Sequence, residues 1–349
     1  MSRGGSSGHG AEGWLRNAWY VADWADAITD ALTSLEILGE RVVLFRAEDG
    51  QPVALEDACP HRKLPLSMGR REGDTLVCGY HGLAFDRSGT CVAAPTQTAL
   101  PKACVRSYPL AERYGLVWIW MGDPTKADPA TIVDIPQWGS PDWGYNRGPM
   151  MQVDCHYLYV VDNLLDPTHV TWVHPGSFGD ASCAAVPIET LSAPDGVTAA
   201  RWLMDTAPAP FYAKFLKFTG HADRYQHYEM RYPSNAVIKA VFVPAGSGGH
   251  DTPLHPDAFC MDSFNFLTPV SARQTRYFWF QLRNFAPDDA AVSEEFTADV
   301  KHAFEEDRVI LNAVQIGMET SPTPTIDLKN DLASFRFRQT LARMIAAEG

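Results

Sequence analysis

The sequence predicts an α+β protein of two domains: an all-β first domain and a second domain that mixes strands with a long helix. Three observations support this fold class. The 349 residues exceed the usual size of a single domain. Short apolar runs separated by turn residues fill residues 14–123, whereas longer aromatic runs and one stretch of helical periodicity occupy the second half. A segment containing Pro and Asp, residues 128–142, lies between them, so we place the domains at residues 14–128 and 129–349.

Two hairpins are expected in the first domain, because in each case a turn sequence joins two short apolar runs. The hairpins pair residues 41–46 with 52–56 and residues 83–85 with 90–92. A further run, Gly-Leu-Val-Trp-Ile-Trp at residues 115–120, predicts a well-buried strand.

The second domain combines both kinds of periodicity. Residues 236–243 and 275–281 are rich in aromatic and β-branched residues, which favours strands. Glycine and serine at residues 246–249 predict a loop between them. Residues 288–319 repeat apolar side chains at three- and four-residue steps, which predicts a long helix.

Composition narrows the classes of function. The formal net charge of −13 argues against nucleic acid or an anionic membrane surface as the main partner. No window approaches 18 consecutive apolar residues, so no membrane span is predicted. Residues 1–13 are mostly polar and glycine-rich, without an apolar signal region, and we expect a flexible tail. Seven cysteines without an export signal indicate thiols or metal ligands in a reducing cytoplasm rather than a disulfide framework.

Four potential metal ligands lie close together in the first domain. Cys59-Pro-His61 is followed, after sixteen residues, by Cys78-Gly-Tyr-His81. Two thiolates and two imidazoles suit a Rieske [2Fe–2S] cluster, in which the cysteines hold one iron and the histidines hold the other. A structural zinc site uses the same donors and is the alternative. The other cysteines have no ligand-like spacing and are expected to be ordinary thiols: Cys91, Cys104, Cys155, Cys183 and Cys260.

A second candidate site begins with His169 and His174. An open iron site requires two imidazoles and one carboxylate on one face. Histidines five residues apart point in different directions on an ideal helix, so they converge only if the helix is distorted. Pro167 supplies a reason for distortion, such as a π-type bulge. The alternative is two unrelated histidines near a helix end.

Asp307 is the candidate carboxylate. The apolar stripe of the late helix is expected to contain Phe296, Val300, Phe304, Leu311 and Val314. Asp307 falls on this stripe, whereas Glu305 and Glu306 fall off it. A buried carboxylate is normally paired or bound to a metal, because its desolvation is costly. The alternative is a salt bridge to a core arginine.

Together these residues resemble the oxygenase (α) subunits of Rieske non-haem iron oxygenases. Cys59, His61, Cys78 and His81 match the cluster motif of that family, and Asn163-Leu-Leu-Asp166-Pro-Thr-His169 with His174 matches its iron motif. The chain is most similar to the subgroup of vanillate O-demethylase, dicamba demethylase and toluenesulfonate methyl-monooxygenase. The resemblance implies a β-rich Rieske domain joined to an α+β catalytic domain with a large antiparallel sheet.

The resemblance also implies roles, cofactors and partners. Asp307 would be the third iron ligand. Asp166 would join the iron ligand His169 to the cluster ligand His81 of a neighbouring subunit in a homotrimer, and Asn163 would lie near the iron. Each subunit would hold one [2Fe–2S] cluster and one Fe(II), with O₂ as cosubstrate. Electrons would come from NADH through a separate reductase or ferredoxin, since the chain lacks a dinucleotide-binding fingerprint.

Two other classes of function remain as alternatives. A stand-alone Rieske electron carrier would leave the motif around His169 unexplained, and a zinc-stabilised binding protein would hold no iron. We expect a small aromatic, acidic substrate, but whether it is demethylated or hydroxylated stays open. Possible substrate contacts are the aromatic residues Phe264, Phe266, Trp279 and Phe280 and the lysines Lys214, Lys217 and Lys239. Sheet core and solvated surface are the respective alternatives for these two groups.

Overall fold

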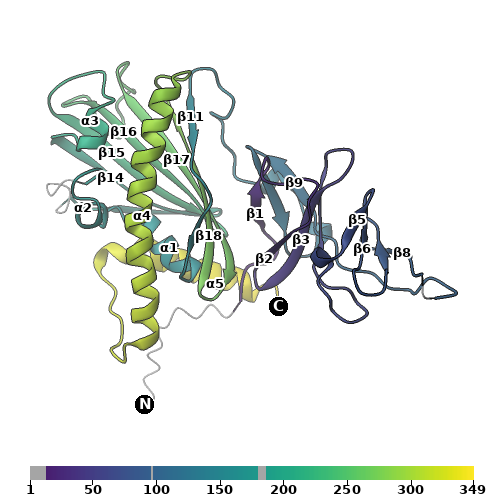
Figure 1. Cartoon of the computed structure of the whole chain (residues 1–349). Coiled ribbons are helices and arrows are strands. Elements are labelled where there is room, and N and C mark those ends of the chain that lie inside the picture. The colour runs from purple at the N-terminus through teal and green to yellow at the C-terminus, as the bar shows by residue number, and fades with distance from the viewer. Residues whose placement is uncertain (1–12, 96, 180–185) are drawn as a thin grey trace, which may run out of the picture. The chain divides into compact units, whose positions relative to one another are not determined.

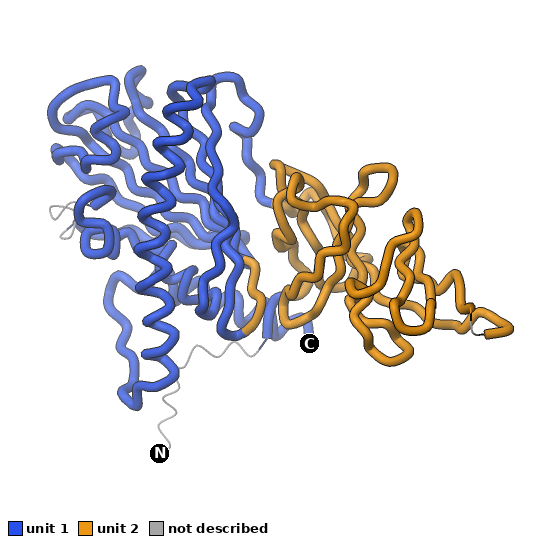
Figure 2. Tube along the Cα trace, viewed as in Figure 1, with its two compact units in different colours: residues 1–15, 133–267, 272–349 blue, residues 16–132, 268–271 orange. Residues whose placement is uncertain are grey.

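A computed structural model describes residues 13–95, 97–179 and 186–349. The chain divides into two compact units (Figure 2). Residues 16–132 with 268–271 form what we call the N-terminal unit, and the described residues of 13–15, 133–267 and 272–349 form the C-terminal unit. All but Gly13 of the expected tail, residues 1–13, lies outside the described residues, as does Cys183.

The N-terminal unit is built from three small antiparallel sheets (Figure 1). Their strands are β1 (Trp19–Trp24), β10 (Leu116–Trp120) and β9 (Leu110–Arg113); β2 (Thr33–Ile37), β3 (Glu40–Arg46) and β4 (Pro52–Glu56); and β5 (Arg70–Glu72), β6 (Thr75–Val77), β7 (Ala84–Phe85) and β8 (Cys91–Ala93). Short 3₁₀ turns lie at η1 (Leu66–Met68), η2 (Pro124–Lys126) and η3 (Pro129–Thr131). Both predicted hairpins are confirmed, as β3–β4 and β7–β8, and every residue of β10 is buried.

The C-terminal unit is organised around one eight-stranded sheet. Its order is β11-β18-β17-β16-β15-β14-β13, with β12 also paired to β18. The strands are β11 (Gly144–Arg147), β12 (Met151–Val153), β13 (Glu189–Ala193), β14 (Gly196–Thr206), β15 (Ala222–Arg231), β16 (Asn235–Pro244), β17 (Phe259–Ser271) and β18 (Gln274–Arg283). The two strands predicted in this half are confirmed as β16 and β18, and the fold class is therefore α+β.

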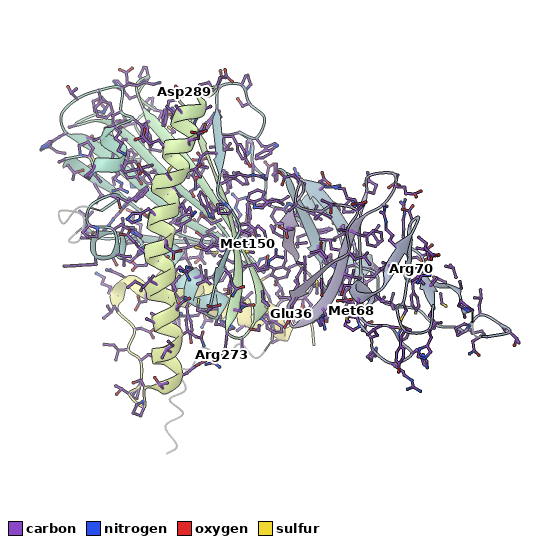
Figure 3. The ribbon with its side chains drawn as sticks, viewed as in Figure 1. Glu36, Met68, Arg70, Met150, Arg273 and Asp289 are labelled. Atoms are coloured by element: carbon purple, nitrogen blue, oxygen red, sulfur yellow. The ribbon has the colours of Figure 1, made fainter. Side chains whose placement is uncertain are left out.

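Helices complete the C-terminal unit. They are α1 (Tyr157–Leu164), α2 (Val170–Val173), α3 (Pro210–Ala213), α4 (Ala290–Thr320) and α5 (Leu332–Ala346), with the 3₁₀ turn η5 (Lys329–Asp331) before α5. The predicted long helix is α4, which runs along one face of the sheet (Figure 1). Asp289 lies at its first turn (Figure 3) and caps it by accepting a hydrogen bond from the Val292 N–H. Within the described part of the chain, no helix combines the length and apolar character that crossing a membrane requires.

The buried face of α4 differs from the predicted stripe in two positions. The buried residues are Phe296, Val300, Ala303, Asp307, Leu311 and Gln315. Phe304 is half-buried against Tyr277 and Trp279, and Val314 is 39% exposed. The last turns of α4 pack against the chain before α1, where Gln315 accepts a hydrogen bond from the His156 N–H. That contact turns Gln315 inward and leaves Val314 at the surface.

Candidate metal centres

Two loops of the N-terminal unit carry the four predicted cluster ligands. One loop follows β4 and contains Cys59 and His61, and the other follows β6 and contains Cys78 and His81. The loops close with the same hydrogen bonds: the Cys59 N–H donates to Leu64 O at 2.9 Å and the Cys78 N–H donates to Leu83 O at 2.8 Å. In each loop the cysteine carbonyl accepts from the N–H four residues later. The chain therefore builds two equivalent turns, as a cluster held from two sides requires.

Both turns need a left-handed backbone conformation at the fourth residue after the cysteine. Gly82 takes φ +73° in the second turn, whereas the first turn places Lys63 there with φ +59°. A lysine in this region is strained, because its Cβ approaches the neighbouring carbonyl. The conformation persists because the hydrogen bonds around Cys59 determine it.

The four candidate ligand side chains are arranged as a Rieske cluster would require. Cys59 and Cys78 are each 2% exposed and belong to the same hydrophobic core of the unit. Burial is the main reason that the pKa of Cys59 is raised in this arrangement. The rings of His61 and His81 lie on the outer side, 4.5 Å apart between centroids. His81 Nδ1 is buried and has no hydrogen-bond partner among the described residues, so the donor set fits a metal cluster.

Asp57 holds the first of these loops in place. Its side chain is buried and accepts hydrogen bonds from the Ser34 and Ser67 hydroxyls and from the Ser67 N–H, at 2.6–2.8 Å. Asp57 lies two residues before Cys59, so these bonds fix the start of the cysteine loop. Ser67 belongs to η1, which also joins the loop to β5.

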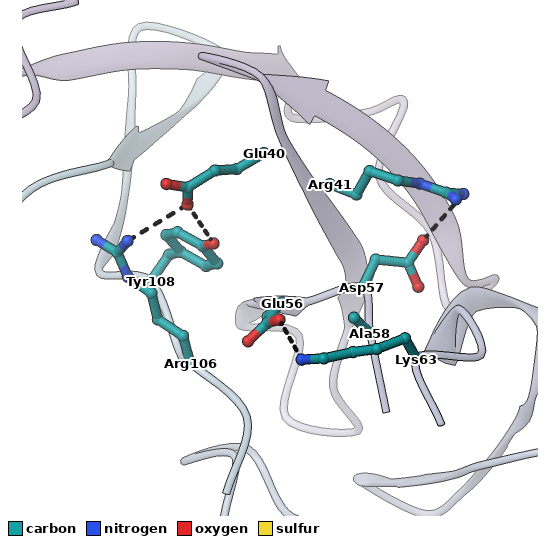
Figure 4. A pocket seen from close by; sticks show the side chains of 8 residues that line it. All are labelled: Glu40, Arg41, Glu56, Asp57, Ala58, Lys63, Arg106 and Tyr108. Carbon is teal, nitrogen blue, oxygen red and sulfur yellow. Dashed lines mark hydrogen bonds and ion pairs between the residues drawn. The ribbon is translucent and has the colours of Figure 1, made fainter. Parts of the chain in front are cut away.

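A pocket of about 480 Å³ lies beside this loop (Figure 4). It is lined by Glu40, Arg41, Glu56, Asp57, Ala58, Lys63, Arg106 and Tyr108. Each acidic side chain in it already has a cationic partner: Glu40 pairs with Arg106, Glu56 with Lys63, and Asp57 with Arg41. The pocket therefore presents no unmatched charge for a ligand.

The second candidate site lies in the C-terminal unit, where the chain passes from α1 to α2. The predicted π-type bulge is wrong, because the helix is interrupted completely. α1 ends at Leu164, Pro167 lies in the connecting turn, and α2 contains only four residues. His169 and His174 stand immediately before and after α2, and His174 leaves the helical conformation with φ −117° and ψ 48°. The break allows two histidines five residues apart to point to one place.

The histidines converge on the Asp307 carboxylate, which α4 carries to the same place. His169 Nε2 and His174 Nε2 lie 3.6 and 3.3 Å from Asp307 Oδ1. One potential ligand atom from each of the three residues lies within 4.8 Å of the others. Atoms bound to one ion at bond lengths of about 2.1 Å lie roughly 3–4 Å apart. Two imidazoles and a carboxylate on one side of such an ion form the donor set of non-haem Fe(II) enzymes.

The second ring nitrogen of each histidine has its own partner. His169 Nδ1 lies 2.5 Å from the Asp166 carbonyl oxygen, and His174 Nδ1 lies 2.7 Å from Glu306 Oε2. Acceptors in these positions favour the tautomers with the proton on Nδ1, which leaves each Nε2 free to bind a metal. Burial lowers the pKa of His174, but its hydrogen bonds to Asp307 and Glu306 outweigh burial and raise that pKa above its usual value. The contact between Glu306 and His174 was not predicted from the sequence, which places Glu306 off the apolar stripe of α4.

Asn163 and Asp166 lie beside this site. The Asn163 Nδ2 donates to Asp307 Oδ1 at 3.0 Å, which orients the carboxylate. The Asp166 Oδ1 accepts from the Thr168 N–H and hydroxyl at 2.7 and 2.5 Å. Within the subunit, the partner of His169 is therefore the main-chain carbonyl of Asp166 and not its carboxylate. Asp166 Oδ2 makes no hydrogen bond among the described residues.

The residues considered for substrate contacts lie elsewhere. Phe264, Phe266, Trp279 and Phe280 are all at most 2% exposed and belong to the sheet core. Lys214 pairs with Glu295 and Asp299 at the surface, and Lys239 pairs with Asp262. Lys217 is exposed. None of these three lysines is a buried charge in need of a partner.

Arg224 of β15, in contrast, is a buried charge in need of a partner. Only 3% of it is exposed, and its guanidinium lies over the Tyr212 and Phe242 rings, 4.7 and 5.1 Å from their centroids. Nη1 donates to the Phe178 carbonyl, Nη2 donates to the Tyr212 hydroxyl, and Nε has no partner. No carboxylate in the described ranges contacts it. Phe178 in turn packs against the His174 ring, which places this cation near the candidate iron site.

Two protein-family models match the chain, one in each half. Residues 18–109 match the Rieske [2Fe-2S] domain and residues 153–347 match the vanillate O-demethylase oxygenase C-terminal domain. The chain is 38% identical to the iron–sulfur subunit of the toluene-4-sulfonate monooxygenase system of Comamonas testosteroni, over 96% of this chain and 98% of that protein. It is 34% identical to the vanillate O-demethylase oxygenase subunit of Pseudomonas sp. (strain HR199 / DSM 7063), over 95% of each.

Solved structures extend the comparison to the fold. The crystal structure of dicamba monooxygenase bound to 3,6-dichlorosalicylic acid matches with a TM-score of 0.88 and 30% identity, covering 96% of this chain and 99% of that chain. Another crystal structure of that enzyme, with non-haem iron and dicamba, matches with a TM-score of 0.79 and 30% identity, over 96% of this chain and 98% of that chain.

The fold and the matched domains define a Rieske non-haem iron monooxygenase, an oxidoreductase that acts as the oxygenase component of its system. Within this class the chain belongs to the vanillate O-demethylase oxygenase family. The resemblance inferred from the motifs is confirmed, and the stand-alone electron carrier and the zinc protein are set aside. A Rieske domain followed by a complete oxygenase domain is more than an electron carrier needs.

Proposed function

We propose that this oxygenase inserts one atom of O₂ into a methyl group of a small, acidic aromatic compound. If the methyl group is an aryl methoxy carbon, the hydroxylated product breaks down to a phenol and formaldehyde. The second oxygen atom leaves as water, and two electrons and two protons balance the reaction. The observation that carries this proposal is the convergence of His169, His174 and Asp307 in a chain that also matches a Rieske domain.

We assign the ligands as follows. Cys59, His61, Cys78 and His81 hold the [2Fe–2S] cluster, and His169, His174 and Asp307 hold the mononuclear Fe(II). Residues 14–128 would form the cluster domain and residues 129–349 the iron domain. When bound, the cluster supplies single electrons and the iron supplies O₂ activation. Asn163 orients Asp307, and the Asp166 carbonyl orients His169.

We propose that the protein is a homotrimer in the cytoplasm. It would receive electrons from NADH through a separate reductase or ferredoxin. Exposed apolar side chains lie beside each candidate centre. Trp172, between the two histidines, is 77% exposed, whereas Met68 and Tyr80, beside the cluster loops, are 68% and 56% exposed. Figure 3 marks Met68 in the N-terminal unit. If these surfaces of neighbouring subunits met, all three side chains would be buried. The cluster of one subunit would then lie close to the iron of its neighbour.

An acidic substrate is supported by Arg224. Among the described residues the buried Arg224 guanidinium has no carboxylate partner, and leaving such a charge unpaired costs free energy on the order of several kcal/mol, which an anionic ligand offsets. Side chains alternate along β15, so Arg224 shares a face with Gln226, which bonds Arg201. Arg201 in turn donates to the Pro167 carbonyl within the iron motif. A carboxylate or sulfonate at Arg224 would thus hold the ring on the side of the sheet that faces the iron ligands.

The proposed function is tested by turnover on paired substrates. The purified protein with a reductase, NADH and O₂ is expected to release formaldehyde from methoxybenzoates, and faster than from the matched neutral methoxybenzyl alcohols. Arg224→Met is expected to raise KM for the acids by at least about tenfold, since a desolvated charged hydrogen bond contributes roughly 1.5–3 kcal/mol. It should change KM for the alcohols little. Arg308→Met, which removes a partly exposed arginine paired with Glu305, is the control.

Two results would contradict this proposal. No oxidised product from any methyl-bearing aromatic substrate would reject the reaction. An equal loss of Arg224→Met activity on acids and alcohols, with unchanged preference, would reject an anion-binding role for this arginine and leave it a part of the core.

The role proposed for Asp166 is tested separately. Its carboxylate would accept a hydrogen bond from His81 of the neighbouring subunit through Oδ2 and so couple the two centres. Asp166→Asn is expected to fold, trimerise and keep both metals, but to reoxidise its cluster more slowly by at least about tenfold with substrate and O₂, because an amide lacks the charge. Rapid-mixing absorbance at the cluster band measures this rate.

Thr168→Val provides the control for a purely local role of Asp166. It removes the hydroxyl that donates to Asp166 Oδ1 but keeps the carboxylate. If Asp166 serves only the turn, both variants should slow to the same extent. A near-native reoxidation rate in Asp166→Asn would also exclude the intersubunit role.

A further inference from the structure

One imidazole of the candidate iron site lies between two consecutive carboxylates. His174 has Nε2 3.3 Å from Asp307 Oδ1 and Nδ1 2.7 Å from Glu306 Oε2. Among the described residues the other imidazole has a single carboxylate neighbour, Asp307, because His169 Nδ1 faces the Asp166 carbonyl at 2.5 Å. The two histidines therefore differ in the group that faces Nδ1, which is a charged carboxylate for His174 and a neutral carbonyl for His169.

The difference follows from how α4 places residues 306 and 307. Successive side chains on a helix diverge by about 100°, so neighbouring residues do not normally reach the same group. Here Asp307 points into the buried face and is 5% exposed, while the Glu306 side chain is 33% exposed at the edge of that face. The His174 ring fits between them because the chain leaves α2 at this residue and turns its ring toward α4.

The Glu306 carboxylate is not committed to a structural ion pair. Its neighbour Glu305 is paired with Arg308 one turn away. In the parts of the chain that are described, Glu306 pairs only with histidines: His174, and the exposed His302, whose Nε2 lies 3.7 Å from Oε1. No lysine or arginine there neutralises it. Its carboxylate therefore lies against the Nδ1–H of His174 without a competing lysine or arginine among the described residues, although water screens part of its charge because 33% of the side chain is exposed.

We infer that Glu306 is a positioning residue for the mononuclear metal and sets the affinity of the site through His174. This inference rests on the proposed ligand set. By accepting the Nδ1–H bond, Glu306 holds the tautomer with Nε2 free, fixes the ring plane, and makes that nitrogen a stronger donor. The Asp166 carbonyl fixes His169 in the same way but adds no charge. His174 is thus the stronger of the two imidazole ligands.

The test measures metal binding and not turnover. Protein that retains its cluster but is stripped of mononuclear metal is titrated anaerobically with Fe(II), and the dissociation rate is followed with a chelator. Glu306→Ala is expected to weaken Fe(II) binding by roughly 10- to 100-fold, as loss of such a partner typically does. Glu306→Gln should bind more weakly than the native protein and no more weakly than Glu306→Ala, since an amide oxygen still accepts the bond but carries no charge. Glu305→Gln is the matched control and should bind normally.

A spectroscopic measurement separates positioning from general destabilisation. Substitution with Co(II) gives visible and EPR spectra that depend on the ligand field, and these should change in both Glu306 variants and not in Glu305→Gln. Circular dichroism and cluster absorption report whether the variants are folded. Fe(II) affinity within about twofold of the native value in folded Glu306→Ala, with an unchanged Co(II) spectrum, would overturn the inference.

A parallel titration of Asp307→Ala distinguishes this failure from failure of the ligand set. If Asp307→Ala loses Fe(II) binding while Glu306→Ala keeps it, the ligand set stands and the role of Glu306 is rejected. If both variants bind normally, the site itself is misassigned and the inference fails with it.

Discussion

Replacing Asp307 with alanine is expected to remove the mononuclear iron and to leave the [2Fe–2S] cluster in place. Asp307 is the only carboxylate that both histidine Nε2 atoms approach among the described residues, at 3.3 and 3.6 Å. Without it two neutral imidazoles remain, and a divalent ion loses both a bond and a charge. Activity should fall by more than the roughly 10- to 100-fold typical of losing an outer partner. His169→Ala and His174→Ala should behave alike.

The measurement is iron and acid-labile sulfide per subunit. Iron should fall from three atoms to two, with sulfide constant at two, since the cluster lies in the other unit. Asp299→Ala removes an acidic residue from the same helix that pairs with Lys214 and serves as the control. Full iron content in Asp307→Ala would move the carboxylate role elsewhere, with Glu306 the next candidate.

The second large effect is expected from Cys78→Ala, which should abolish the cluster. A Rieske cluster has two thiolates on one iron, and the remaining Cys59 cannot hold that iron alone. His61→Ala should also lose the cluster, because its imidazole is one of two on the other iron. Visible absorption and acid-labile sulfide should disappear, and with them all reductase-driven activity. The mononuclear iron should remain.

Cys91→Ala is the matched control for this prediction. Cys91 is a free, buried cysteine in the same core as Cys59 and Cys78, so its replacement removes a thiol of similar surroundings. It should keep the visible spectrum of the cluster. A coloured, active Cys78→Ala protein would show that the cluster ligands are misassigned.

The elements of the fold that sequence analysis predicts well are those determined by local signals. The turn at residues 48–50 specifies the β3–β4 hairpin, and an unbroken run of apolar residues specifies β10. The periodicity of residues 288–319 specifies α4. Val314 was wrongly placed in the buried stripe, because its exposure depends on the contact between Gln315 and the segment before α1. That contact joins residues 159 positions apart and leaves no local pattern.

The candidate sites follow the same rule. The spacing of Cys59, His61, Cys78 and His81 is local and could be read directly, as could Asp307 from its position on an apolar stripe. Pro167 predicted a distortion but not its form, since a bulge and a complete break have the same sequence signal. Glu306 gave no signal because it is a polar residue at a partly exposed position, where glutamate is common. Arg224 becomes unusual only in the structure, where Leu203 and Phe242 lie opposite it in the neighbouring strands and no described carboxylate contacts it.

The two centres can also form at different times as the chain is made. The candidate cluster ligands lie within residues 59–81, on loops closed by their own hydrogen bonds, so we expect them to come together once this part of the chain has been made. The iron site cannot form until α4 has been made, because more than 130 residues separate His174 from the α4 residue Glu306 that it contacts. In a partial chain that ends before α4, a divalent ion could bind the two histidines but not the Asp307 carboxylate. On the proposed ligand set, we therefore expect the mononuclear iron to bind only once the C-terminal unit has folded, so that its binding free energy stabilises the folded unit.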